Sequence, residues 1–192
     1  MQLQHVNFKL RIANAGEPDL APLIPVFHNW IQAQVFGDLL LDVADYRHVP
    51  AGPGVVLIGQ EGDYSVDNTD HRLGVRYNRK APLDGSNQDR LCQAARAALT
   101  ACQHLEAEPG LDGRFRFNGR EIELFFNDRL LAPNRDSTRD AAQPDLDVFF
   151  RRLFRGGEHA LSYGSDPRRL FTVFATSSQP FLVSDLLSNL NA

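Results

Sequence analysis

The stretch that most constrains the fold is residues 39–64, LLLDVADYRHVPAGPGVVLIGQEGDY, where two apolar runs flank a loop of Arg, His, Pro and Gly. Short apolar runs bounded by Gly and Pro are typical of strands. We therefore expect strands at residues 39–46 and 55–59, joined by a loop at residues 47–54. The first run begins with consecutive apolar residues, which predicts a central strand that is covered on both faces.

Further strands are predicted where apolar and polar residues alternate, because successive side chains of a strand point to opposite faces. This pattern predicts strands at residues 5–12, 61–66, 73–78, 115–126, 159–163 and 170–176. Turn-forming residues separate most neighbouring runs, which predicts hairpins. Within residues 115–126 an Asn-Gly pair stands between two alternating runs, the strongest short-range signal for a hairpin, so we expect the chain to turn there.

Apolar residues at helical spacing predict three main helices and a short terminal one. We expect the first to end at Gly37 and the longest to lie between residues 84 and 108, followed by helices at residues 146–154 and 182–190. Residues 131–145 are rich in Pro, Asn, Asp, Ser and Arg and show no apolar period, so they are predicted to form a loop.

These elements predict one α+β domain over residues 1–192, in which an antiparallel, hairpin-rich sheet or sheets pack with three main helices. The order helix, Gly, hairpin, helix occurs twice, at residues 23–105 and 146–190. An internal pseudo-duplication with halves 1–110 and 111–192 is therefore one interpretation. Turn residues also recur by chance, so that interpretation stays open.

Composition narrows the classes of function. The 192-residue chain is 43% hydrophobic and carries a net charge of -4, which favours a folded protein and disfavours nucleic acid as a partner. No apolar run approaches the ~20 residues of a membrane span. Cys92 and Cys102 lie roughly 15 Å apart on one predicted helix, too far for a disulfide. We expect a cytoplasmic protein with reduced cysteines and no membrane partner.

Reactive side chains gather where the first apolar run ends. Asp45, Arg47 and His48 bring a carboxylate, a guanidinium and an imidazole beside the loop, and Glu61 follows the second run. Such groups can serve acid-base roles. Strand geometry, however, puts Asp45 and Arg47 on one face and His48 on the other. A simpler interpretation is that Arg47 pairs with a carboxylate and His48 caps a rigid loop.

Basic residues follow the predicted strand 73–78 and its exit: Arg72, Arg76, Arg79 and Lys80. A guanidinium pairs well with a carboxylate or a phosphate, so Arg76 and Arg79 are candidate contacts for an anionic ligand. The alternative is an ordinary solvated strand face.

Several motif families are absent from the sequence. It has no phosphate-binding loop, no nucleophile elbow, no dinucleotide fingerprint and no zinc-hydrolase motif. Residues 63–71 contain three Asp and one His but lack the spacing of a calcium loop. We therefore expect neither a metal nor a cofactor.

Two functional hypotheses follow. The first is a non-catalytic binding or assembly module, in which the loop at residues 46–54 and the basic strand face receive a small anionic ligand or a partner protein. The second is an enzyme that uses Asp45, Arg47, His48 and Glu61. We favour the first, because no acid-base pair, and no nucleophile with a base, occurs at a sequence spacing that indicates catalysis. A third alternative is a homodimer formed through the Phe-rich segments 115–126 or 149–154.

Overall fold

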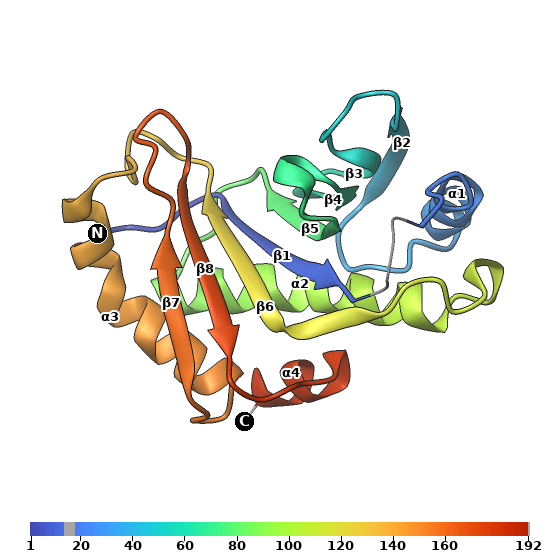
Figure 1. The fold of residues 1–192 in the computed structure, drawn as a ribbon. Coiled ribbons are helices and arrows are strands. Elements are labelled where there is room, and N and C mark those ends of the chain that lie inside the picture. Colours follow the sequence, from blue (N-terminus) through green and yellow to red (C-terminus); the bar gives the residue numbers. More distant parts are fainter. Residues whose placement is uncertain (14–17, 192) are drawn as a thin grey trace.

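Eight antiparallel strands form one sheet, in the order β2-β3-β4-β5-β1-β6-β8-β7 (Figure 1). This computed structural model describes residues 1–13 and 18–191. The strands are β1 Val6–Ile12, β2 Leu40–Tyr46, β3 Gly54–Gly59, β4 Gly62–Asp67, β5 Gly74–Arg79, β6 Phe117–Phe126, β7 His159–Tyr163 and β8 Phe171–Ser177. Consecutive strands β2 to β5, and the pair β7 and β8, are joined as hairpins. The predicted α+β class and its hairpin-rich antiparallel sheet are confirmed.

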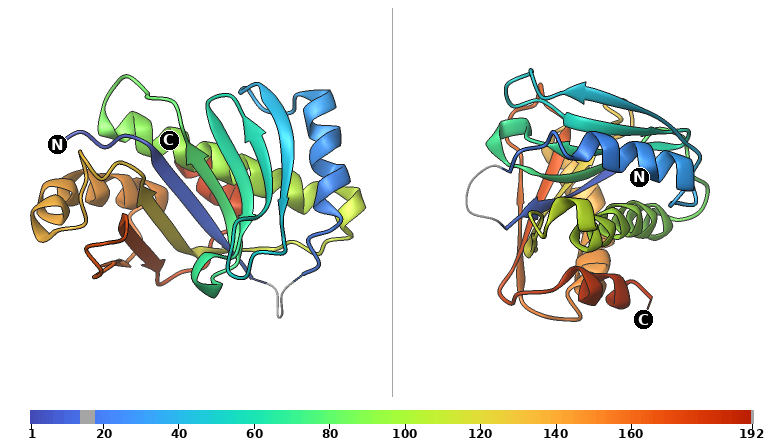
Figure 2. Two further views of the ribbon diagram at one scale, coloured as in Figure 1. Left: turned by 90° about the horizontal axis from the view of Figure 1, so that it is seen from above. Right: turned by 90° about the vertical axis from the view of Figure 1, so that its right-hand side faces the viewer.

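Four α-helices cover one face of this sheet: α1 Leu23–Ala33, α2 Asn87–Ala107, α3 Asp136–Leu153 and α4 Val183–Asn189. The longest, α2, lies against β1 and β5, while α1 lies at the β2 end and α3 at the β7 end (Figures 1 and 2). The start of α2 is fixed by a capping box, in which Ser86 and Asp89 accept each other's backbone amides. None of the described helices is long and apolar enough to cross a membrane.

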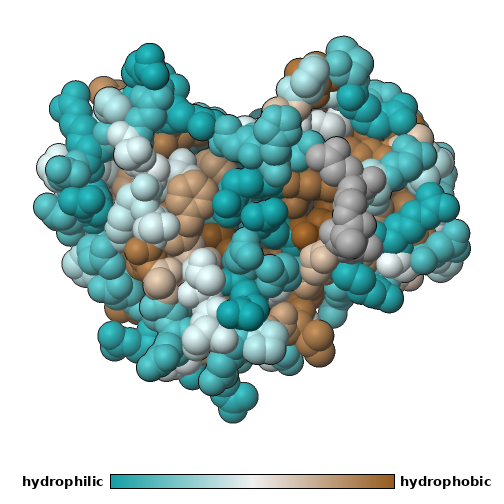
Figure 3. All heavy atoms as spheres, in the orientation of Figure 1, coloured by the Kyte–Doolittle hydropathy of each residue, from teal (hydrophilic) through white to brown (hydrophobic). Residues whose placement is uncertain are grey.

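None of the described helices lies on the opposite side of the sheet (Figure 1), and we call this side the open face. In the space-filling view the molecule is notched between the lobe with the β7–β8 turn and the lobe with the β2–β3 loop (Figure 3). Hydrophilic side chains gather on the surface below this notch. Because the sheet twists and curls, strands from its two ends flank a hollow rather than a flat surface.

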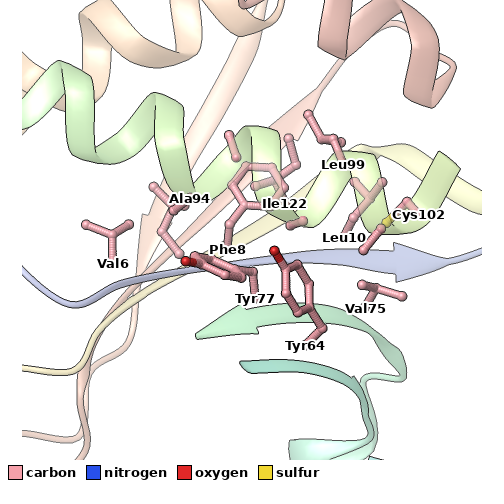
Figure 4. Packing of buried hydrophobic residues seen from close by; sticks show 14 of the residues in the cluster. Val6, Phe8, Leu10, Tyr64, Val75, Tyr77, Ala94, Leu99, Cys102 and Ile122 are labelled. Atoms are coloured by element: carbon pink, nitrogen blue, oxygen red, sulfur yellow. The ribbon is translucent and has the colours of Figure 1, made fainter. Parts of the chain in front are cut away.

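The hydrophobic core lies between α2 and the central strands (Figure 4). Phe8 and Leu10 of β1 and Val75 and Tyr77 of β5 are at most 1% exposed, and Leu99 of α2 packs against the same cluster. Burying each such side chain stabilises the fold by roughly 1.5 to 3 kcal/mol. Their alternation along β1 and β5 is the pattern that predicted these strands, and it sends the intervening polar side chains to the open face.

The prediction that residues 39–46 form a central strand is wrong, because β2 pairs only with β3 and lies at the edge of the sheet. Leu40 is 2% exposed, but its neighbours Leu39 and Leu41 are 51% and 53% exposed. The consecutive leucines therefore do not mark a strand covered on both faces.

The hairpin predicted within residues 115–126 is also wrong, since β6 runs without a turn between β1 and β8. Asn118 pairs opposite Arg11, beside a register shift in β1. A Cβ added to Gly119 would lie 2.2 Å from the carbonyl oxygen of Phe181. Gly119 thus serves a close backbone approach rather than a turn.

The loop predicted at residues 131–145 is helical from Asp136 onward, because it forms the first half of α3. The buried stripe starts with Thr138 and Ala142 and continues to Leu146, at spacings of four residues. Thr and Ala are weak apolar signals, and the exposed Pro144 inside the helix looks like a loop residue.

The structure does not confirm an internal duplication. The two segments that resemble each other begin at Gly59 and Gly156. Gly59 ends β3 within a hairpin, whereas Gly156 follows the end of α3. Their shared residues therefore serve different local structures.

Candidate functional site

The loop that follows β2 is held by a local ion pair. Arg47 donates from Nε and Nη2 to the two carboxylate oxygens of Asp45, at 2.9 and 2.8 Å, and its backbone amide donates to Oδ1 at 3.0 Å. These hydrogen bonds lower the pKa of Asp45 to about 2. The ring of His48 stacks on that of Tyr46, with centroids 6.4 Å apart. Arg47 is thus engaged within its own loop.

Glu61 and Arg79 meet at the far end of β3 and β4, away from this loop. Nη1 of Arg79 lies 2.6 Å from Oε2 of Glu61, and its Nε donates to the carbonyl oxygen of Ala81 at 2.8 Å. Asp45 pairs opposite the start of β3, and Glu61 follows its end, which separates them by about six residues or roughly 20 Å of strand. Asp45, His48 and Glu61 therefore do not share one pocket.

Arg76 lies on the open face, whereas Arg79, three residues further along the same strand, points to the opposite side of the sheet. On the open face, Arg76 of β5 stands beside Lys9 of β1, and Asn78 stands beside Asn7. These four side chains form two polar rows across the middle of the sheet. Of the six candidate residues from the sequence, the structure thus brings together Asp45 with Arg47 and Glu61 with Arg79, and places Arg76 apart from both pairs.

The charges around Arg76 are almost balanced. Four cations of the open face have a carboxylate within 3.1 Å: Lys9 with Asp67, Arg11 with Glu121, Arg72 with Glu123 and Lys80 with Asp63. Arg76 is the fifth cation of this group. Within residues 1–13 and 18–191, its nearest contact to a carboxylate, from Nη1 to Oδ2 of Asp67, is 3.8 Å, which exceeds hydrogen-bond distance. The group therefore carries one surplus positive charge, on Arg76.

The Arg76 side chain reaches across β1 and lies over the ring of Phe125, with its guanidinium carbon 4.5 Å from the ring centroid. It is 18% exposed. Burial lowers its pKa, although a guanidinium stays charged at neutral pH. Within the described chain, its buried Nε has no hydrogen-bond partner. A fixed, charged donor is thus left unused.

Two neighbouring amides are also unused. No group in residues 1–13 or 18–191 hydrogen-bonds to Nδ2 or Oδ1 of Asn7, or to Oδ1 of Asn78, and all three atoms are buried. Each buried polar atom left unpaired costs about 1 to 3 kcal/mol. Such atoms are rare in folded proteins, where buried polar groups are usually hydrogen-bonded to protein or to ordered water.

A pocket of about 550 Å³ is lined by Arg76 and Asn78 but not by Asn7. One wall comes from the edge of the sheet and its loop, with Tyr46 and Pro53. The other comes from the polar strand face, with Arg76, Asn78 and Lys80. The volume lies within the usual range for small-molecule sites. The loop at residues 46–54 and the basic strand face, distant in sequence, thus line a single pocket.

Sequence reasoning missed Asn7 and Lys9, although a signal was present. Both occupy the polar positions of the alternating segment 5–12. Polar positions in such a strand are normally read as solvated, and only the strand order shows that β1 lies in the middle of the sheet.

Metal ligands are not grouped in this region: within the part of the chain that the structure describes, no set of three or more His, Cys, Asp or Glu could hold a metal ion. The sequence matches no known protein-family model, and no curated protein matches it significantly.

Proposed function

We propose that this protein is a non-catalytic binding module that holds a small anionic ligand, bearing a carboxylate or a phosphate, in the open-face pocket. The observation that carries this proposal is Arg76, a mostly buried cation that lines the pocket and has no hydrogen-bonded carboxylate among the described residues. The cytoplasm is the proposed location, because both cysteines are buried and unpaired.

The chemistry of the pocket supports an anion. A guanidinium can offer a carboxylate or phosphate two parallel hydrogen bonds, and such charge-assisted bonds are stronger than neutral ones. Stacking on Phe125 holds the Arg76 guanidinium in place before the ligand arrives, so less side-chain entropy is lost on binding. The side-chain amide oxygen of Asn78, Oδ1, adds an acceptor for a hydroxyl or amino group of the ligand.

The enzyme alternative has less support. Among the residues that line the pocket, Asp63 is paired with Lys80 and Asp67 with Lys9. A general base needs to be within hydrogen-bond reach of a substrate proton, and these carboxylates are already engaged.

A homodimer through the Phe-rich segments also has less support. Phe115, Phe126, Phe149 and Phe150 are each fully buried. They therefore do not form the exposed apolar patch that such an interface would need.

The proposal can be tested by NMR titration with inorganic phosphate and, separately, with acetate. We expect the Nε-H signal of Arg76 to shift and to saturate, since no group in the described part of the chain accepts from this donor. The variant Arg76→Gln should abolish the accompanying shift of the Asn78 side-chain amide. Arg139→Gln is the matched control, because Arg139 pairs with exposed carboxylates on α3. Equal binding by both variants would overturn the proposal.

A further inference from the structure

Arg76 also lines a second cavity, of about 240 Å³, on the part of the open face formed by β6 and β8. Its apolar wall is formed by Phe125 of β6 and Phe174 of β8. Thr172 of β8 also lines it, together with Asn134 from the segment before α3. The guanidinium of Arg76 thus stands between a polar pocket and a smaller, partly aromatic one.

An ion pair joins two distant turns at this cavity. Nη2 of Arg169, in the β7–β8 turn, donates to Oδ1 and Oδ2 of Asp70 at 2.9 and 2.7 Å. Asp70 belongs to the short 3-10 helix η1, Thr69–His71, between β4 and β5. Both ionic side chains line the cavity and are about half exposed, at 47% and 57%, whereas Phe125 is 8% exposed. The ion pair therefore lies on the outer side of the cavity and Phe125 lies deep within it.

The backbone of the turn that carries Asp70 is strained. Asp70 and His71 both adopt left-handed backbone angles, with φ of 59° and 57°. Such angles are unfavourable for a residue with a side chain. The contact of the Asp70 carboxylate with Arg169 is one interaction that holds this turn in place.

From this geometry we infer that the smaller cavity takes an apolar group of the ligand, and that the Asp70–Arg169 ion pair closes over it. The inference rests on the proposed function, since Arg76 holds the anionic group in both. The ligand class is then a small carboxylic acid with an aromatic or branched aliphatic substituent. A dry protein cavity of about 150 Å³ can already hold benzene, so this cavity has room for one aromatic ring.

A matched pair of probes tests this inference: acetate and phenylacetate, which differ by one phenyl group. We expect phenylacetate to bind about tenfold more tightly or better, because burial of the ring removes apolar surface from water. In Phe174→Ala this advantage should largely disappear, while the affinity for acetate stays unchanged. Phe174 is only half-buried, so the variant should fold.

The role of the ion pair needs a separate variant, Asp70→Asn, which keeps the shape of the side chain and removes its charge. We expect phenylacetate to exchange severalfold faster in this variant, as for an opened lid, and acetate to exchange as in the wild type. Asp112→Asn is the matched control, because it changes an exposed Asp-Arg pair, Asp112 with Arg114, that lines neither cavity.

The outcomes separate the two proposals. If neither acid shifts the Arg76 Nε-H signal, the proposed function fails. If both acids bind with equal affinity, or if phenylacetate keeps its advantage in Phe174→Ala, the cavity does not take the apolar group and only the further inference fails. If Asp70→Asn exchanges phenylacetate at the same rate as Asp112→Asn, the ion pair does not close the site.

Discussion

Lys9 and Asp67 form a buried ion pair that spans three strands: Nζ lies 2.5 Å from Oδ1, and the side chains are 0% and 3% exposed. Lys9 lies on β1 and Asp67 on β4, with β5 between them. The β5 residue opposite Asp67 is Gly74, and a Cβ added there would be 3.1 Å from Cε of Lys9. The lysine therefore passes over a position that has no side chain.

Breaking this pair should be costly. In Lys9→Met the carboxylate of Asp67 stays buried without its main cation, and we expect the free energy of unfolding to fall by about 3 to 5 kcal/mol in urea denaturation. Lys80→Met is the matched control, because the Lys80–Asp63 pair is partly exposed and should contribute less than about 1 kcal/mol. Similar losses in the two variants would contradict the special role of burial.

Gly74 itself should not tolerate a side chain. In Gly74→Ala the new Cβ would lie 2.5 Å from the carbonyl oxygen of Leu10, so strands or side chains must shift. We expect a loss of about 1 to 3 kcal/mol in the free energy of unfolding, as for other overpacked sites. Gly37→Ala is the control, since nothing lies within 4 Å of its added Cβ. Equal melting temperatures for these variants would argue against the close approach.

Titration with acid tests the Asp45–Arg47 ion pair at the β2 edge of the sheet. Because the folded pKa of Asp45 is about 2, below the ordinary value of 3.8 for this side chain, the stabilisation by Arg47 is complete above about pH 4 and is lost as the pH falls through 2. In Arg47→Gln the carboxyl should titrate near 3.8, as followed by its carbon chemical shift. A titration midpoint that stays near 2 in this variant would mean that a group other than Arg47 lowers the pKa of Asp45.

Much of the fold could be predicted from local patterns, since alternation marked β1, β5, β7 and β8, and helical spacing marked α2. The errors have a common cause, which is that tertiary contacts decide what a local signal means. Gly119 serves a close approach to Phe181, where the sequence suggested a turn. The stripe of α3 relies on Thr138 and Ala142, which carry little apolar signal.

The candidate site was predicted only in part. The alternation of side chains correctly placed Arg76 on a polar strand face. Arg79 is three residues further along the strand, so its side chain lies on the opposite side of the sheet, where it pairs with Glu61. Asn7 and Lys9 could not be singled out, because their burial follows from the central position of β1 and from the Arg76 side chain that reaches across it.

A substitution of Asn7 tests stability and ligand binding in the same variant. Its two amide atoms are buried and unpaired within the described chain, so a nonpolar side chain of similar shape avoids their desolvation cost. We expect Asn7→Leu to raise the free energy of unfolding by about 1 to 3 kcal/mol. Asn189→Leu is the control and should be destabilising, because Asn189, which is also buried, donates to the carbonyl oxygen of Leu153 at 2.9 Å.

The same Asn7→Leu variant should bind acetate more weakly if the amide supports the anion held by Arg76. A more stable protein with weaker binding would identify Asn7 as a residue kept for the ligand at a cost in stability. A loss of stability in Asn7→Leu would instead mean that the amide is satisfied in solution, and a gain in stability with unchanged binding would remove Asn7 from the site.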